Sequence, residues 1–161
     1  MKNPIGLQTA YWSGTNPKQN IHQIIRLTKA AGMDIIELKA ADFVSLSALE
    51  RSDLRKEIKQ AGLCITVNGT GLRPQRDISS SNIEVHKAGI RHLKYMIDLC
   101  KEMGAIYFSE IPYGLWNTKP EGKDVAEIKK IRTENAISGL KEVAEHAHKT
   151  GVILCMEIVN R

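Results

Sequence analysis

The sequence predicts an α/β fold with a parallel sheet: the N-terminal portion, about five strands and four helices, of a (β/α)8 barrel. The first observation is a sequence pattern that occurs four times, in which a helical stretch ends in glycine and a short apolar run follows directly. Such a pattern is typical of a βα repeat. The second observation is that these runs are continuous rather than alternating, which is typical of parallel strands covered on their faces. The third is the spacing of the glycines, Gly32, Gly62, Gly104 and Gly151, which are 30, 42 and 47 residues apart and so near the length of a barrel unit.

Each expected strand follows one of these glycines, except the first, which opens the chain. We expect strands at residues 5–9, 33–37, 63–68, 105–110 and 152–157. A left-handed glycine is a common helix end, and a lysine two or three residues earlier suits the negative end of the helix dipole. No GxGxxG or P-loop follows the first strand, which disfavours a nucleotide-binding open sheet, the other architecture that a βα repeat allows.

Each of the four expected helices has a start signal, an apolar stripe or both. The start signals are Asn16 followed by Pro17, Ser47 with Glu50, and Ser81 with Glu84; the last two pairs have capping-box spacing. The stripes are Ile21, Ile24, Ile25 and Thr28 on the first helix, Leu93, Met96, Ile97 and Cys100 on the third, and Ile137, Leu140, Val143, Ala144 and Ala147 on the fourth. Spacing of this kind predicts helices that bury one face.

Composition narrows the classes of protein. The 161 residues, 42% hydrophobic and 25% charged, are enough for a single domain over 1–161. No apolar run approaches the ~20 residues of a membrane span, and the first residues lack the layout of a signal peptide, so we expect a cytoplasmic protein with no membrane partner. Three scattered cysteines without zinc-finger spacing indicate reduced core residues. The net charge of +5 is spread along helix faces without clustered aromatic residues, so we expect no nucleic-acid partner.

Polar side chains stand at or near the C-terminal end of every expected strand. They are Gln8, Glu37, Asn68, Glu110 and Glu157. Ligands of parallel α/β proteins bind at that edge, so the recurrence indicates a site, although each residue alone is equally explained by a hydrogen bond to a loop. Glu157 closes an apolar strand, where an unpaired carboxylate is costly, and therefore needs a cation nearby, either a metal or a basic side chain such as Arg161.

Three segments resemble the ketose 3-epimerases, the D-tagatose and D-psicose 3-epimerase group of the xylose-isomerase-like barrels. They are Ala10-Tyr11-Trp12, Asp34-Ile35-Ile36-Glu37 and Leu154-Cys155-Met156-Glu157-Ile158-Val159-Asn160-Arg161, of which the last is the most specific. The resemblance runs with interruptions through the whole chain. It covers only slightly more than half of such a protein, which closes its barrel with roughly a hundred or more further residues. It implies an isomerase of carbohydrate metabolism with a small-molecule sugar as substrate.

The resemblance also implies a cofactor and a mechanism. One divalent ion, manganese, cobalt or magnesium, is expected between a Glu, an Asp, a His and a second Glu at the ends of strands five to eight, and the first of these ligands is Glu157. The ion polarises the sugar oxygens. Two glutamates, Glu157 among them, remove and return the C3 proton from opposite faces through a cis-enediolate. The other ligands and the second catalytic carboxylate lie beyond Arg161, so we expect the reaction to need a missing C-terminal half.

Several further residues are expected around the sugar. Trp116 resembles the loop tryptophan that lines the family's sugar pocket, and Trp12 can stack on the apolar face of a sugar, although loop packing explains either ring equally well. Gln8 stands where the family has an aromatic residue, and Ser109 and Glu110 stand where it tends to have a glycine pair; these departures leave open which sugar binds and whether it is phosphorylated. The expected sugar contacts are Trp116, Gln8, Trp12 and Glu110, with Glu37 and Asn68 behind them.

Two alternatives to an epimerase stay open. The first is a catalytically inactive, truncated half-barrel that serves as an assembly or interaction unit, because Glu157 supplies one ligand where at least three are wanted. The second is an apurinic endonuclease-like DNA-repair protein of the same superfamily. That function needs zinc-binding histidines at strand ends, whereas all five histidines of the chain lie on expected helices, so it is the less favoured.

The last expected strand, 152–159, predicts association. It should be a central strand of a closed barrel, yet the sequence ends where its next neighbour would begin. Unpaired backbone groups and apolar side chains at such an edge are a template for pairing. We therefore expect a homo-oligomer or a complementary C-terminal half as the partner.

Overall fold

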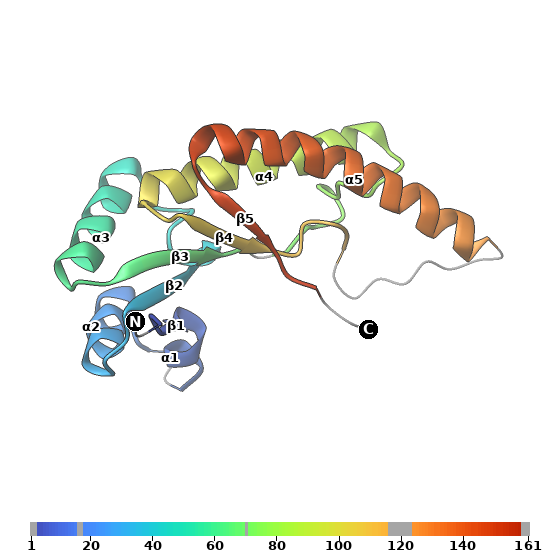
Figure 1. The fold of residues 1–161 in the computed structure, drawn as a ribbon. Helices are drawn as coiled ribbons and strands as arrows, with labels where there is room; N and C mark the ends of the chain where they lie inside the picture. The colour runs from blue at the N-terminus through green and yellow to red at the C-terminus, as the bar shows by residue number, and fades with distance from the viewer. Residues whose placement is uncertain (1–2, 16–17, 70, 116–123, 159–161) are drawn as a thin grey trace.

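The structure is a computed structural model that describes residues 3–15, 18–69, 71–115 and 124–158. Within them, five parallel strands form one sheet in chain order, and helices connect successive strands (Figure 1). The elements are β1 (Gly6–Gln8), α1 (Thr9–Thr15), α2 (Ile21–Ala30), β2 (Ile35–Lys39), a 3-10 turn (Ala40–Asp42), α3 (Ala48–Gln60), β3 (Cys64–Asn68), α4 (Ile83–Met103), β4 (Tyr107–Glu110), α5 (Val125–Thr150) and β5 (Ile153–Met156). The predicted α/β fold with a parallel sheet is confirmed.

One face of the sheet is buried beneath the helices. Ile36, Leu38, Val67 and Phe108 are fully buried there, and each contributes about 1.5–3 kcal/mol through the apolar surface it removes from water. The residues that alternate with them along the strands have intermediate exposure. We call the surface they form the open face; it consists of Gln8, Glu37, Lys39, Thr66, Asn68, Ser109 and Cys155.

The helix ends agree with the sequence at the glycines. Gly32, Gly62, Gly104 and Gly151 have φ of 74°, 70°, 75° and 77°, a left-handed conformation that glycine adopts at little cost. Each precedes a strand by a few residues, which confirms the βα repeat. At the start of α3, the Ser47 side chain accepts the backbone N–H of Glu50 and the Glu50 side chain accepts the N–H of Ser47, as the capping-box spacing predicts.

One predicted helix start is wrong, and the described residues hold one helix more than expected. The first long helix, α2, has Asn20 as its N-cap, in a capping box with Gln23, and the predicted Asn16-Pro17 start lies outside the described residues. The N-cap of α4 is Asn82, whose side chain accepts two backbone N–H groups, instead of Ser81. The described residues hold five α-helices and a 3-10 turn rather than four helices. Sequence analysis missed α1 because its seven residues lack a capping pattern and an apolar stripe.

The two longest helices, α4 and α5, pack against each other and enclose part of the segment that links β3 to α4. Ile78 of that segment is fully buried. A Cβ added at Gly89 of α4 would lie 2.7 Å from Ile78, and one at Gly139 of α5 would lie 3.3 Å from it, so two glycines make the space that this side chain fills. None of the helices described combines the length and apolar character needed to cross a membrane.

Candidate functional site

Strand register brings polar side chains together at the C-terminal end of the open face. Lys39 of β2 lies opposite Asn68 of β3, Asn68 lies opposite Ser109 of β4, and Ser109 lies opposite Cys155 of β5. Because side chains at paired positions point to the same side of a sheet, these four residues form one row across the open face. That row is where a parallel sheet presents its ligand.

Gln8 and Glu37 form the next part of the site. They are paired in the register of β1 and β2, and the Gln8 side-chain amide donates to Glu37 Oε2 over 2.7 Å. A hydrogen bond to a carboxylate is stronger than one between neutral groups. The pair therefore holds the Glu37 carboxylate in one orientation, and the structure brings these two predicted site residues into contact.

Glu157 follows β5 directly and extends its ladder. Its backbone N–H donates to the Glu110 carbonyl oxygen over 2.8 Å, so the alternation of β5 continues through it. Leu154 packs against the core, which places Cys155 and then Glu157 on the open face. The Glu157 residue is exposed. The carboxylate is thus available to a ligand on the same side of the sheet as Glu37 and Asn68.

Glu110 lies on the buried face of the sheet, opposite to the open face. It comes two residues after the buried Phe108 and is itself only 2% exposed. Its Oε1 accepts the backbone N–H groups of Gly71 and Ile111, both over 2.9 Å. Burial raises the pKa of the Glu110 carboxyl, with a smaller contribution from the Glu157 charge, while the two N–H groups and Arg76 oppose the rise. Strand alternation therefore separates Glu110 from Glu37 and Glu157, although all three were expected together.

Of the two tryptophans predicted to bind sugar, Trp12 is among the residues that the structure describes. The Trp12 indole N–H donates to Thr28 Oγ1 of α2 over 2.9 Å, and the ring packs beside the core. Its neighbour Tyr11 meets it edge to face, with ring centroids 5.1 Å apart. Trp12 therefore fixes α1 against α2. Trp116 lies outside the described residues.

Sequence analysis missed Lys39 as a residue of the site. Its ammonium group donates to Ser13 Oγ over 3.4 Å and lies 4.0 Å from Asp42 Oδ1, while Asp42 Oδ2 also accepts the Lys39 backbone N–H. The lysine is therefore held at the mouth of the open face, beside α1. The available signal was strand alternation, because Lys39 stands two residues after Glu37 and so shares its face.

The donor set for a divalent ion is incomplete in the part of the chain that the structure describes. Residues 3–15, 18–69, 71–115 and 124–158 contain no group of three or more His, Cys, Asp or Glu residues that could hold a metal. Glu157 offers one hard oxygen donor, whereas Mn²⁺, Co²⁺ or Mg²⁺ needs several. These residues alone therefore do not fit a bound ion.

The histidines occupy other roles. All five lie on helices, as expected: His22 on α2, His86 and His92 on α4, and His146 and His148 on α5. His92 accepts from Arg76 over 3.2 Å. Burial, together with the Arg76 charge, lowers its pKa to about 4. His146 and His22 lie beside the carboxylates of Asp98 and Glu57, so they serve contacts within the helical layer.

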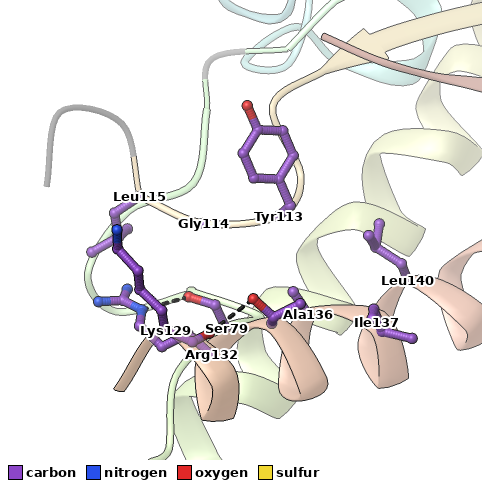
Figure 2. A pocket seen from close by; sticks show the side chains of 10 residues that line it. Ser79, Tyr113, Gly114, Leu115, Lys129, Arg132, Ala136, Ile137 and Leu140 are labelled. Atoms are coloured by element: carbon purple, nitrogen blue, oxygen red, sulfur yellow. Dashed lines mark hydrogen bonds between the residues drawn. The ribbon is translucent and has the colours of Figure 1, made fainter. Parts of the chain in front are cut away.

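A cavity of about 500 Å³ lies away from the open face, between α5 and the segment after β4. Its lining includes Tyr113, Leu115, Arg132 and Ile137, and Figure 2 shows Arg132 directed at Ser79. Arg132 also forms an ion pair with Asp77 over 2.7 Å. The Arg132 guanidinium, one of two charged groups beside this cavity with Lys129, is therefore already engaged by the segment between β3 and α4.

Comparisons with known proteins agree with this geometry. The sequence pattern of the xylose isomerase-like TIM barrel matches residues 25–161. A ketose 3-epimerase of Arthrobacter globiformis and an L-ribulose 3-epimerase of Mesorhizobium japonicum are each 26% identical over 157 residues, which is 98% of this chain and 51% and 50% of those proteins. The chain thus spans about half the length of these curated relatives.

Solved structures give the same result. The crystal structure of a D-psicose 3-epimerase from Clostridium cellulolyticum H10 with D-tagatose matches with a TM-score of 0.85 and 22% identity, over 99% of this chain and 53% of that one. The structure of an L-ribulose 3-epimerase matches with a TM-score of 0.80 and 26% identity, over 99% and 51%. The chain belongs to the xylose isomerase-like TIM-barrel family, and within it the chain is similar to about half the length of the ketose 3-epimerases.

Proposed function

We propose that this chain supplies half of the active site of a sugar epimerase that inverts C3 of a ketose. The observation that carries the proposal is the position of Glu157 on the open face, beyond the row that contains Asn68 and Ser109. The relatives are named for ketose, L-ribulose and D-psicose 3-epimerisation, which supports the reaction class. The remaining wall of the site has to come from further βα units that close the barrel.

The proposed chemistry at Glu157 is proton transfer. Its carboxylate takes the proton from C3, and the electron pair of the broken C–H bond moves toward the C2 carbonyl, which gives a cis-enediolate. Return of a proton to the opposite face of C3 inverts the stereocentre. The second carboxylate for that step is proposed to lie outside the described residues. A divalent ion, when bound, would polarise the sugar oxygens, and Glu157 would be its ligand from this chain.

The neighbouring polar groups are proposed to orient the sugar. Asn68 and Ser109 offer hydrogen-bond donors and acceptors in one row, and Gln8 holds Glu37 below them. Lys39 adds a cation at the mouth of the face. We propose Gln8, Asn68 and Trp116 as sugar contacts, with Glu37 as the group that orients Gln8.

Exchange of the C3 proton tests the proposal. The chain is combined with a complementary half from a ketose 3-epimerase, and deuterium incorporation into a free ketohexose is measured in D2O with Mn²⁺ present. We expect Glu157→Gln, which keeps the shape of the side chain but removes the basic oxygen, to lower exchange by at least about 10³-fold. Glu145→Gln, at an exposed position on α5, serves as the matched control and should retain exchange. Full exchange in Glu157→Gln would remove this residue from the mechanism.

A second candidate function is an inactive half-barrel that acts as an assembly unit. The observation that favours it is the apolar surface at the last strand, where Ile153, Met156 and Ile158 are 50%, 56% and 84% exposed. Exposed apolar groups beside an unpaired strand edge favour association. Sedimentation at micromolar concentration tests this candidate, because an assembly unit forms a defined oligomer yet shows no C3 exchange with any complementary half.

A further inference from the structure

Glu110 is a buried carboxylate that has no role in the proposed reaction. It is the last residue of β4 and faces the helical layer. Burying a carboxylate is costly unless its oxygens are hydrogen-bonded, and Oε1 receives both of its N–H partners at 2.9 Å. Those partners come from different segments: Gly71 follows β3 and Ile111 follows β4. One oxygen atom thus joins the starts of two loops at the C-terminal edge of the sheet.

The fit around the second oxygen is equally specific. A Cβ added at Gly69 would lie 1.8 Å from Glu110 Oε2 and 2.4 Å from Glu110 Cδ, far inside any allowed contact. Gly69 is not among the glycines with positive φ, so its backbone does not require glycine. Its N–H donates to the Ser109 carbonyl over 2.7 Å. Glycine is therefore needed at residue 69 to make room for the carboxylate.

The far end of the segment between β3 and α4 is fixed by other contacts. Asp77 is 3% exposed, receives the N–H and hydroxyl of Ser79, and pairs with Arg132 of α5. Ile78 fills the space between α4 and α5. Arg76 links the two ends, because it bonds His92 of α4 and lies close enough to Glu110 to stabilise the ionised carboxyl. Among the described residues of the segment, Gly71 at its start is the one whose backbone N–H is bound by the Glu110 carboxylate.

We propose that Glu110 is a positioning residue that fixes the start of the β3–α4 loop, from Gly69, against the end of β4. Asn68 comes directly before that start and lies on the open face, so the position of the loop sets the position of a proposed sugar contact. The inference rests on the proposed function for the identity of the ligand. The contacts themselves, in which the Glu110 carboxylate accepts the Gly71 and Ile111 N–H groups, belong to this chain alone. We call them the Glu110 clamp.

Amide hydrogen exchange on the 161-residue chain tests the clamp. We expect Glu110→Ala to raise the exchange rates of the Gly71 and Ile111 amides at least tenfold, with amides of β2 unchanged. Glu110→Gln keeps an acceptor oxygen and should restore slow exchange at both amides. Glu145→Ala, at an exposed position, is the matched control. Unchanged rates in Glu110→Ala, a rise spread equally through β2, or a Gln variant as fast as the Ala variant would each overturn the proposal.

A second set of variants covers the case in which Glu110→Ala does not fold. Gly69→Ala forces its Cβ onto the carboxylate and should lower the Tm, whereas Gly14→Ala, whose Cβ would meet nothing within 4 Å, should not. Combining Gly69→Ala with Glu110→Gly should recover part of the lost Tm. A Gly69→Ala protein as stable as the Gly14→Ala protein would show that the carboxylate does not occupy this place.

The completed barrel gives the functional readout. With the complementary half present, Glu110→Ala should raise KM for the ketohexose several-fold more than it lowers kcat, and Glu110→Gln should reverse the change, since the clamp positions a binding residue. If wild type shows no exchange with any ketose, the proposed function fails while the amide result still decides the clamp. If wild type turns over and KM is unchanged in Glu110→Ala, the positioning role fails and the proposed function stands.

Discussion

The segment between β3 and α4 and the region around β5 make a contrast within one sheet. In the former, the buried carboxylates have partners: Asp77 pairs with Arg132 and Glu110 accepts two N–H groups. The half-buried His92 accepts from Arg76. Around β5, half of Ile153 and most of Ile158 face solvent. Buried polar contacts thus hold the segment between β3 and α4 in place, whereas apolar side chains around β5 remain exposed. The difference predicts that substitutions in the first region change folding, whereas those in the second change association.

The largest expected effect is at Asp77. Asp77→Ala removes the acceptor of three hydrogen bonds and leaves the Arg132 side chain, 31% exposed, without its carboxylate partner. Removing one member of a largely buried pair costs about 3 kcal/mol. We expect chemical denaturation to show a loss of that size in the free energy of unfolding. Asp53→Ala, in a pair whose side chains are 61% and 65% exposed, should change it by less than about 0.5 kcal/mol, and equal losses would contradict the contrast.

A smaller, pH-dependent effect is expected at His92. Its pKa is lowered to about 4 by burial and by the Arg76 charge, whereas in the unfolded chain it is about 6.5. Since the unfolded state binds the proton first, the contribution of neutral His92 to stability is fully present above pH 6.5. It is lost as the pH falls toward 4, and amounts to about 1–2 kcal/mol after allowance for partial exposure.

Urea denaturation between pH 7 and pH 4 checks this expectation. The stability of His92→Gln, which keeps an acceptor for Arg76, should fall less over that range than the stability of wild type. His148→Gln, at an exposed position on α5, is the matched control and should follow wild type. Parallel curves for wild type and His92→Gln would show that burial and the Arg76 charge do not keep the imidazole neutral in the folded protein.

The features of the fold that depend on neighbouring residues in the sequence could be predicted. The glycines that end helices and the capping box at Ser47 act through neighbouring residues, so sequence reveals them. Helix starts at Asn20 and Asn82 were missed because several polar residues compete at each place, and tertiary packing selects one. Glu110 was expected beside Glu157 because both end strands. The face on which a strand residue lies depends on the alternation along the strand, and the burial of Phe108 places Glu110 on the buried face.

The smallest effect on folding, with a large one on association, is expected at β5. Ile153 lies on the same face as Tyr107, to which it is paired, and the two are 50% and 48% exposed. Because lysine replaces a side chain already half in water, Ile153→Lys should change the free energy of unfolding by less than about 0.5 kcal/mol. The charge opposes pairing of this surface with another sheet, so sedimentation should shift from an oligomer for wild type to a monomer. Leu49→Lys, at a 70% exposed position on α3, should leave the oligomer intact. A monomeric wild-type chain, or an oligomer that survives Ile153→Lys, would show that the region around β5 is not where the chain associates.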